Sequence, residues 1–335
     1  MLPTSSIAMA TYNGEKYLQR QLDSFVEQTV LPNELVVCDD GSTDKTVEIL
    51  HHFAKTAPFP VRIFQNDRNL GICANFCKAF SLCEKDVTFF SDQDDYWFPQ
   101  KLEKVLKVME TEPEVGLVLT YDQRVDANEK PVWMPSLAAL TSDLKKENSI
   151  RTLFRHNRYV WATHNMACRT SWRERIMREK QLPVCIDTWL FRVMGIASHV
   201  RVIPEPCCAF RRHGENATSH SRGEKNLLIL LYRSVKRHCD IYRMYGRYLS
   251  WQEVVSFFQD KSPLDEEILA EYQQITAHLR ARIEILTHFW RRPWFWGREL
   301  FTGRYFRYST KCVCDIFSDL FAWPQKLPQE LERKE

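Results

Sequence analysis

Short apolar runs alternate with amphipathic stretches over the first 120 residues of the chain. The runs are brief and rich in β-branched and aromatic residues, a composition typical of strands buried within a sheet. We predict five such strands, at Ser6–Ala10, Leu35–Cys38, Val61–Phe64, Val87–Phe90 and Val115–Thr120.

The stretches between these runs carry apolar residues at helical spacing, which cover one face of a helix. Two sets are clear, Leu18, Leu22, Phe25 and Val26 in one stretch and Leu102, Val105, Leu106 and Met109 in another. Alternation of strand and helix at this spacing predicts an α/β fold with a mostly parallel central sheet flanked by helices. Ligands of such sheets bind beyond the carboxyl ends of the strands, so residues just after each strand are the candidates for chemistry.

The pattern changes further along the chain. Residues 121–150 are polar and contain Pro131 and Pro135, which indicates a long connection, and the signal from Ile150 to about Ser221 is less regular. Beyond Gly223, apolar residues at helical spacing predict long helices, at Leu227, Leu228, Leu231 and Val235 and again at Ile268, Leu269, Tyr272, Ile275, Leu279 and Ile283. We therefore expect an α/β domain over 1–222, with halves 1–98 and 99–222, and a helical C-terminal region over 223–335.

Composition narrows the class of protein. A chain of 335 residues with 44% hydrophobic residues can bury a sizeable core. With 27% charged residues and a net charge of only +3, it is neither a disordered chain nor one that binds polyanions over its whole surface. Neither GxGxxG nor GxxxxGK[ST] occurs, so a dinucleotide-binding fold and a P-loop are not supported.

The cysteine pattern bears on the compartment. Eleven cysteines at irregular spacing, without a signal-peptide pattern at the N-terminus, predict a reducing, cytoplasmic location with mostly buried thiols. Cys73-Cys77 and Cys312-Cys314 have the spacing of metal pairs, but no matching Cys/His pair follows. No run of 18 apolar residues occurs, so we expect no membrane-spanning helix.

Three polar clusters each follow one of the expected strands. They are Thr11-Tyr12-Asn13-Gly14, the run from Asp39 to Asp44, and Ser91-Asp92-Gln93-Asp94-Asp95. If they meet at one edge of the sheet, their carboxylates repel one another unless a cation is present. Mg²⁺ and Mn²⁺ prefer such oxygens and often complete their shell with substrate phosphates, so a diphosphate ligand fits the pattern.

A purely structural interpretation exists for the second cluster. The sequence Asp-Gly-Ser-Thr after a strand is also typical of a turn that leads into a helix, with Ser42 or Thr43 as the cap and Asp44 in the first turn. Three such clusters, each at a strand end, favour the shared metal site.

The motifs MATYNG, VVCDDGSTDKT and FFSDQDDYWFPQKL, with Asn69, Gly71 and Asn75 between them, resemble in order and spacing the signature series of inverting family 2 glycosyltransferases. The resemblance extends over residues 5–220. The last motif is similar to the branch that builds bacterial surface polysaccharides, including many rhamnosyltransferases. It implies the GT-A fold, with a nucleotide-binding half at 1–98 and an acceptor half at 99–222.

The resemblance also implies roles for matching positions. Nucleotide contacts fall on Thr11, Tyr12, Asp39, Asp40 and Asp92, while Asp94 and Asp95 belong to the site of a divalent cation, Mg²⁺ or Mn²⁺, that bridges the diphosphate.

Two later segments extend the match. In Cys185-Ile186-Asp187-Thr188-Trp189-Leu190, the resemblance makes Asp187 the catalytic base, although Asp187 also fits a helix N-cap. In Arg211-Arg212-His213-Gly214-Glu215-Asn216, it makes Arg211 and Arg212 a phosphate clamp and His213 a metal ligand or phosphate contact. The alternatives are salt bridges to the acidic edge for the arginines and a surface loop for His213.

The implied reaction is transfer of a sugar, with inversion, from a UDP- or dTDP-sugar to a saccharide or lipid-linked saccharide acceptor. One alternative is a catalytically inactive nucleotide-sugar-binding or scaffold protein. Another is a nucleotidyltransferase, although TYNGEKY is not the glycine-rich basic loop expected of that class.

The segment 287–312 carries six Arg or Lys residues and one Glu, interleaved with Phe, Trp and Tyr. This composition predicts a peripheral contact with an anionic membrane surface at the inner face of the plasma membrane. The alternative is packing against the α/β domain, with Arg side chains covering apolar surface. No recognised nucleic-acid-binding motif accompanies the segment, so no nucleic-acid partner is expected.

Overall fold

The computed structural model describes residues 1–132, 162–177, 185–214, 241–258, 266–308, 316 and 319. The chain divides into two compact units, one formed by 1–150 with 160–219 and the other by 151–159 with 220–335. The helix expected around Leu227 to Val235, and the pair Cys312-Cys314, lie outside the described residues.

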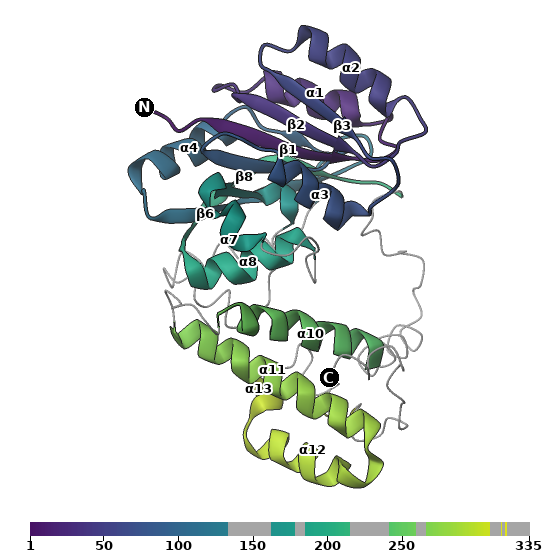
Figure 1. The fold of residues 1–335 in the computed structure, drawn as a ribbon, viewed down its shortest axis with the longest axis vertical. Helices are drawn as coiled ribbons and strands as arrows, with labels where there is room; N and C mark the ends of the chain where they lie inside the picture. The colour runs from purple at the N-terminus through teal and green to yellow at the C-terminus, as the bar shows by residue number, and fades with distance from the viewer. Residues whose placement is uncertain are drawn as a thin grey trace. The chain divides into compact units, whose positions relative to one another are not determined.

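The first unit is built on an eight-stranded sheet of order β3-β2-β1-β4-β7-β6-β8-β5 (Figure 1). The strands are β1 (Ser5–Thr11), β2 (Glu34–Asp39), β3 (Val61–Gln65), β4 (Val87–Ser91), β5 (Tyr96–Trp97), β6 (Val115–Asp126), β7 (Met166–Arg169) and β8 (His199–Arg212). The expected α/β fold is confirmed. In detail the sheet is mixed, because β7 runs antiparallel to both β4 and β6, and β5 runs antiparallel to β8.

Helices flank this sheet (Figure 1). They are α1 (Leu18–Val26), α2 (Thr46–Thr56), α3 (Ile72–Ser81), α4 (Lys101–Thr111), α7 (Arg173–Ile176) and α8 (Ile186–Ala197), with the short 3₁₀ turns η1 (Thr163–Asn165) and η2 (Thr170–Trp172). The apolar faces predicted for α1 and α4 are the buried faces, and both helices contribute to the core around Phe25, Phe89 and Trp97.

The register of the parallel strands gathers their carboxyl ends at one edge. Thr11 of β1 lies opposite Asp39 of β2, and Met9 lies opposite Ser91 of β4. Because parallel strands end at the same edge of a sheet, the three polar clusters that follow β1, β2 and β4 are neighbours in space.

One segment expected as a connection is a strand. Strand β6 continues through residues 121–126, because these residues pair with β8 as far as Asp126 and Arg212. Strand β8 has no simple sequence signal, since it contains Pro204 and Pro206 and its pairing with β6 is interrupted by register shifts.

The second unit is helical, with α10 (Ile241–Phe257), α11 (Glu266–Thr287), η3 (Phe289–Arg291), α12 (Arg292–Phe301) and α13 (Arg304–Tyr308). Trp251 of α10 packs edge-on against Tyr272 of α11 in its core. Among the described residues, none of the helices is both long enough and apolar enough to span a bilayer.

Candidate functional site

Asp39 ties the ends of β1 and β2 together. Its carboxylate is fully buried and accepts hydrogen bonds from the Thr11 hydroxyl (2.9 Å), the Ser42 hydroxyl (2.5 Å) and the Ser42 backbone N–H (2.9 Å). In this arrangement Thr11 and Asp39, both expected to contact the nucleotide, hold the two loops at the edge of the sheet.

Asp40 organises the loop that precedes α3. One carboxylate oxygen accepts from the Asn66 side chain (2.8 Å) and the Leu70 N–H (2.7 Å), and the other accepts from the Gly71 N–H (2.9 Å). Gly71 has φ of 85°, a conformation that favours glycine, which explains why the sequence carries a glycine here. Asp40 is buried, whereas Tyr12 is half exposed at the same edge.

The helix-cap interpretation of the second cluster is wrong. Helix α2 begins at Thr46 with Lys45 at its N-cap, so neither Ser42 nor Thr43 caps it. Asp44 lies before the helix and accepts hydrogen bonds from the Thr46 N–H (3.0 Å) and hydroxyl (2.5 Å).

Asp94 and His213 form a carboxylate–imidazole pair beside the acidic cluster. His213 follows β8, and its Nε2 lies 2.9 Å from Oδ2 of Asp94, while its ring packs against Tyr17 at 4.4 Å between centroids. Burial raises the pKa of Asp94, and the nearby Asp92 charge adds to this, although His213 acts in the opposite direction. The surface-loop interpretation of His213 is wrong, because its side chain is only 7% exposed.

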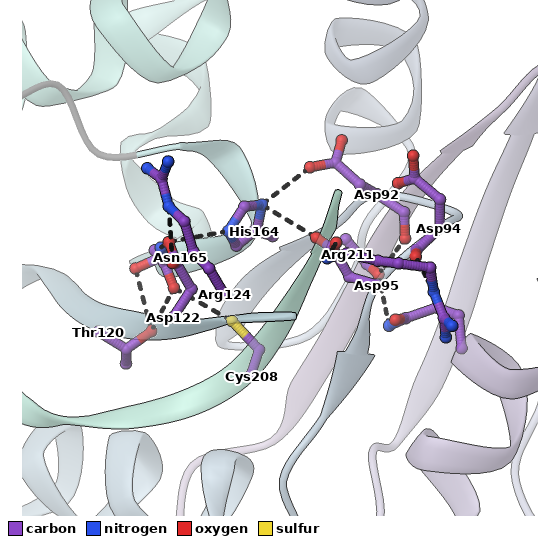
Figure 2. A network of polar contacts seen from close by, with 12 residues as sticks. Asp92, Asp94, Asp95, Thr120, Asp122, Arg124, His164, Asn165, Cys208 and Arg211 are labelled. Carbon is purple, nitrogen blue, oxygen red and sulfur yellow. Dashed lines mark hydrogen bonds and ion pairs between the residues drawn. The ribbon is translucent and has the colours of Figure 1, made fainter. Parts of the chain in front are cut away.

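A second histidine, His164 of η1, lies inside the acidic cluster. Figure 2 shows it between Asp92 and Asp95 on one side and Asp122 on the other. Its Nδ1 is 3.0 Å from Asp92 Oδ2 and 3.1 Å from Asp95 Oδ2, and its Nε2 is 3.5 Å from Asp122 Oδ2. Nothing in the sequence pattern around His164 distinguished it, because η1 follows a stretch without helical or strand periodicity.

Burial and neighbouring charges raise the pKa of two groups in this network. Burial raises the pKa of Asp95 to about 8, despite the opposing charge of His164. Burial alone would lower the pKa of His164, but the surrounding carboxylates, Asp95 first among them, raise it well above the usual range. Burial of Asp95 and the carboxylates around His164 therefore favour the protonated form of both groups, and the imidazolium charge lies among the carboxylates.

Asp187 lies in the first turn of α8, which begins after Cys185 at the N-cap, so the interpretation of Asp187 as the N-cap is wrong. Its Oδ1 accepts a hydrogen bond from the Thr188 N–H (2.5 Å). Burial raises the pKa of Asp187, and the charge of Asp92 contributes in the same direction. Asp187 is thus electrostatically coupled to the acidic cluster.

Arg211 is packed into the site as a structural group. Its backbone N–H donates to Asp95 (3.0 Å), its Nε donates to the Asp94 carbonyl (3.0 Å), and its Nη2 pairs with Glu129 (3.0 Å). The guanidinium also lies over the Tyr17 ring at 4.9 Å. The ion pair of Arg211 is with Glu129, in the turn after β6, and Arg212 is half-buried at the end of β8.

The donor atoms fit a hard divalent cation. The possible ligand atoms of Asp92, Asp95 and His164 lie within 4.8 Å of one another, but a cation there would have to displace the protons that Asp95 and His164 hold. Asp94 with His213 forms a second carboxylate–imidazole pair alongside. Oxygen and imidazole donors of this kind suit Mg²⁺ or Mn²⁺.

This fold and edge-lying acidic site define a glycosyltransferase of the GT-A type. Residues 6–178, more than half of the chain, match the family described as glycosyl transferase family 2, and the chain belongs to that family. An uncharacterized glycosyltransferase of Nostoc sp. is 27% identical over 222 residues, which cover 63% of this chain and 65% of that protein. The chain spans less than two thirds of the length of the curated relatives it matches.

Solved structures agree on the fold. S. aureus TarS 1-349 in complex with UDP-GlcNAc superposes with a TM-score of 0.52 at 17% identity, covering 94% of this chain and 89% of that one. The mannosyltransferase PcManGT from Pyrobaculum calidifontis, in complex with GDP-Man and Mn²⁺, gives a TM-score of 0.53 at 15% identity, covering 96% and 86%.

Proposed function

We propose that this protein transfers a sugar from a nucleotide-diphosphate sugar to a saccharide acceptor, assisted by a divalent cation. The observation that carries the proposal is the pairing of Asp94 with His213, 2.9 Å apart, at the carboxyl edge of a family 2 sheet. The structural neighbours with UDP-GlcNAc and with GDP-Man and Mn²⁺ support a donor of this class.

Asp94 and His213 would hold the cation, with Asp92 beside them. Asp94 keeps 19% of its side chain exposed and Asp92 25%, so a cation there still has open positions for diphosphate oxygens. Asp95 is fully buried and already bonded to the Arg211 N–H, which makes it a support for the site. When bound, the cation would neutralise charge on the departing diphosphate.

Asp187 would act as the general base. It would accept the proton of the acceptor hydroxyl as that oxygen attacks the anomeric carbon, while the nucleoside diphosphate leaves from the opposite face. A single displacement without a covalent intermediate inverts the anomeric configuration. The raised pKa of Asp187 moves its basicity toward that of a catalytic base working near neutral pH.

The donor nucleotide would lie against Tyr12, on the loops that Thr11, Asp39 and Asp40 hold. The half-exposed Tyr12 ring offers a face for a base, and we propose UDP or dTDP as the nucleotide. Arg212, at the end of β8 beside His213, would contact the diphosphate. The motif resemblance supports a role in bacterial surface-polysaccharide synthesis, with rhamnose-like donors and a lipid-linked acceptor.

The second unit would contact the membrane surface that carries such an acceptor. Trp290 and Phe301 are 90% and 97% exposed, and Trp294 and Phe306 are also exposed on η3, α12 and α13. Arg291 and Arg307 are exposed among them. Aromatic residues interleaved with arginines suit the interface of an anionic bilayer, and we propose a peripheral location at the inner face of the plasma membrane.

A thermal-shift panel tests the proposal. UDP, dTDP and GDP and their sugars would each be added with Mn²⁺ or with EDTA, to the wild type and to Asp94→Asn. We expect one nucleotide to raise the unfolding midpoint of the wild type in a Mn²⁺-dependent way, because a ligand stabilises the state it binds. Asp94→Asn should lose the metal dependence. An unchanged midpoint with every nucleotide would favour the inactive scaffold, and turnover of a nucleoside triphosphate would favour a nucleotidyltransferase.

A further inference from the structure

Two cysteine thiols meet beside the candidate base. Cys73 lies at the start of α3, and Cys185 lies at the N-cap of α8, two residues before Asp187. The two helices pack against each other, and the two thiols are hydrogen-bonded to one another. Neither cysteine is in a disulfide.

The environment of this pair favours reaction at Cys185. Cys185 is exposed to solvent and Cys73 is half-buried, whereas the six other cysteines in the described part of the chain are buried. The hydrogen bond from Cys73 lowers the pKa of Cys185 to about 7, so a substantial fraction is thiolate at neutral pH. Burial raises the pKa of Cys77 to about 12, which leaves this neighbour on α3 as an unreactive thiol.

The start of α8 helps to stabilise negative charge on sulfur. The Cys185 backbone N–H donates to its own sulfur and lowers the pKa of that thiol, and the Ile186 N–H, in the first turn of this twelve-residue helix, donates to the Cys73 sulfur. Unpaired N–H groups and the helix dipole at such an end favour a thiolate. The pair therefore combines contact between the sulfurs, access for an oxidant and a thiolate-stabilising end of a helix.

We propose that Cys73 and Cys185 form a reversible disulfide on exposure to hydrogen peroxide, and that this bond slows sugar transfer by displacing the start of α8. In the first step the Cys185 thiolate attacks the peroxide O–O bond, giving a sulfenic acid and, after protonation, water. In the second, the Cys73 sulfur attacks the Cys185 sulfur, the S–O bond breaks and a second water leaves. Two thiols are oxidised and one hydrogen peroxide is reduced to two waters.

The consequence for activity follows from bond lengths. A disulfide holds its sulfurs about 2.05 Å apart, closer than two hydrogen-bonded thiols, so oxidation draws the first turn of α8 toward α3. Asp187 lies in that turn. A misplacement of a reacting group by about 1 Å can cost about 100-fold in rate, so we expect transfer to fall at least tenfold. This part of the inference rests on the proposed role of Asp187, whereas formation of the disulfide does not.

Peptide mapping tests the disulfide without any assay of transfer. The full chain would be treated with a small excess of hydrogen peroxide, alkylated and digested, with Cys73→Ser, Cys185→Ser and Cys77→Ser in parallel. We expect a Cys73–Cys185 cross-linked peptide in the wild type and in Cys77→Ser, but not in Cys73→Ser or Cys185→Ser. Dithiothreitol should abolish this peptide. We also expect slower hydrogen exchange at the start of α8 in the oxidised protein. Oxidation that leaves these two cysteines unlinked would overturn the proposal.

Transfer assays on the same samples separate the two claims. The regulatory role is supported if oxidation lowers the transfer rate of the wild type and dithiothreitol restores it. The transfer rates of Cys73→Ser and Cys185→Ser should not respond to oxidation. A disulfide that forms while transfer is unchanged overturns that role. If the disulfide forms and slows hydrogen exchange, but the reduced protein transfers no sugar, the redox pair is supported and the proposed function is overturned.

Discussion

The side-chain amide of Gln93 is hydrogen-bonded to both backbone polar atoms of Tyr12. Its Oε1 accepts from the Tyr12 N–H at 2.8 Å, and its Nε2 donates to the Tyr12 carbonyl at 2.9 Å. The loops after β1 and β4 are thereby joined across the edge of the sheet. The residue in the middle of the Asp92–Asp94 motif therefore fixes the backbone of the exposed Tyr12 beside the acidic cluster.

Gly14 makes room for this contact, and its replacement by Ala should disturb it. A Cβ at position 14 would lie 2.3 Å from the Gln93 Oε1, so the amide must move and both hydrogen bonds are strained or lost. Loss of such bonds and overpacking each cost about 1–3 kcal/mol, so we expect weaker nucleotide binding by about tenfold or more. Isothermal titration with the nucleotide identified by thermal shift would measure it.

Gly246→Ala in α10 is the matched control for Gly14→Ala, because a Cβ there meets no atom within 4 Å and the position lies outside the first unit. The double variant Gly14→Ala/Gln93→Ala should bind no worse than Gln93→Ala alone, since the clash is gone. Normal nucleotide binding by Gly14→Ala would show that the contact between the loops does not position Tyr12.

His164→Gln should destabilise the first unit strongly. The imidazole lies among Asp92, Asp95 and Asp122, and removing the positive partner from a buried cluster of carboxylates leaves uncompensated charge. Breaking a buried pair in this way typically costs about 3–5 kcal/mol. Urea unfolding of the wild type and His164→Gln, in EDTA, would measure the difference. An unchanged unfolding free energy would mean that the cluster is not held by the imidazole.

Local patterns predicted much of the sheet but not the internal bonding of the site. The five expected strands are all present, and each extends by at least one residue beyond the predicted bounds. Four of the predicted runs are buried on both faces, whereas β3, at the edge of the sheet, is half-buried. The polar clusters after β1, β2 and β4 do share one edge. The direction of each carboxylate was not predictable. Asp39 and Asp40 accept hydrogen bonds from hydroxyl and N–H groups of the neighbouring loops, and the positions of these donors depend on the fold.

His164 and the buried role of Arg211 could not be found from the sequence. His164 reaches Asp92 across 72 positions, and His213 reaches Asp94 across 119, and no local periodicity encodes such contacts. Strand β8, which carries Arg211, is interrupted by two prolines and therefore lacks the alternation that identifies a strand. The family resemblance gave the positions of Asp94 and His213, whereas their contact is a property of the folded chain.

The rate of transfer should fall on the acid side at a higher pH than an ordinary aspartate would give. A general base works only when ionised, so activity is lost as the pH falls through the pKa of Asp187. Burial raises that pKa above the usual value of about 3.9, and the acid limb of kcat/KM moves up with it.

The dependence of kcat/KM on pH would be measured at saturating Mn²⁺, so that loss of the metal at low pH does not determine where the rate falls. Asp187→Glu should keep an acid limb at reduced rate, and Asp187→Asn should lose about 100-fold or more in kcat. An Asp187→Asn enzyme with near-normal turnover would remove the assignment of the base.

Loss of exposed aromatic residues from the second unit should weaken binding to anionic vesicles. Trp290→Ser/Phe301→Ser removes two highly exposed apolar side chains without touching the core. Burial of one such side chain contributes about 1.5–3 kcal/mol, so the pair should weaken partitioning by at least tenfold. Co-sedimentation with phosphatidylcholine–phosphatidylserine vesicles would measure it.

The matched control for the aromatic variant is Val26→Ser/Leu31→Ser, which removes two exposed apolar side chains from the first unit. Binding of the wild type should also fall as salt rises, because the exposed arginines contribute electrostatically. Equal binding by both double variants, or binding indifferent to phosphatidylserine, would exclude the proposed membrane surface.

Asp319→Ala should destabilise the second unit through the charge it leaves behind. Arg282 of α11 pairs with Asp319 through Nε at 2.6 Å and Nη2 at 2.8 Å, the Tyr305 hydroxyl donates to the same carboxylate at 2.8 Å, and all three side chains are buried. Removing one partner of a buried pair costs about 3–5 kcal/mol, whereas replacing both by apolar residues is often neutral. Thermal unfolding should therefore show a large loss of stability in Asp319→Ala, and most of that stability should return in Arg282→Met/Asp319→Leu.

Glu27→Gln, which breaks the exposed pair with Arg20, should change stability by no more than about 0.5 kcal/mol. If the double variant were as unstable as Asp319→Ala, the cost would come from lost packing around Asp319 and not from the unpaired Arg282.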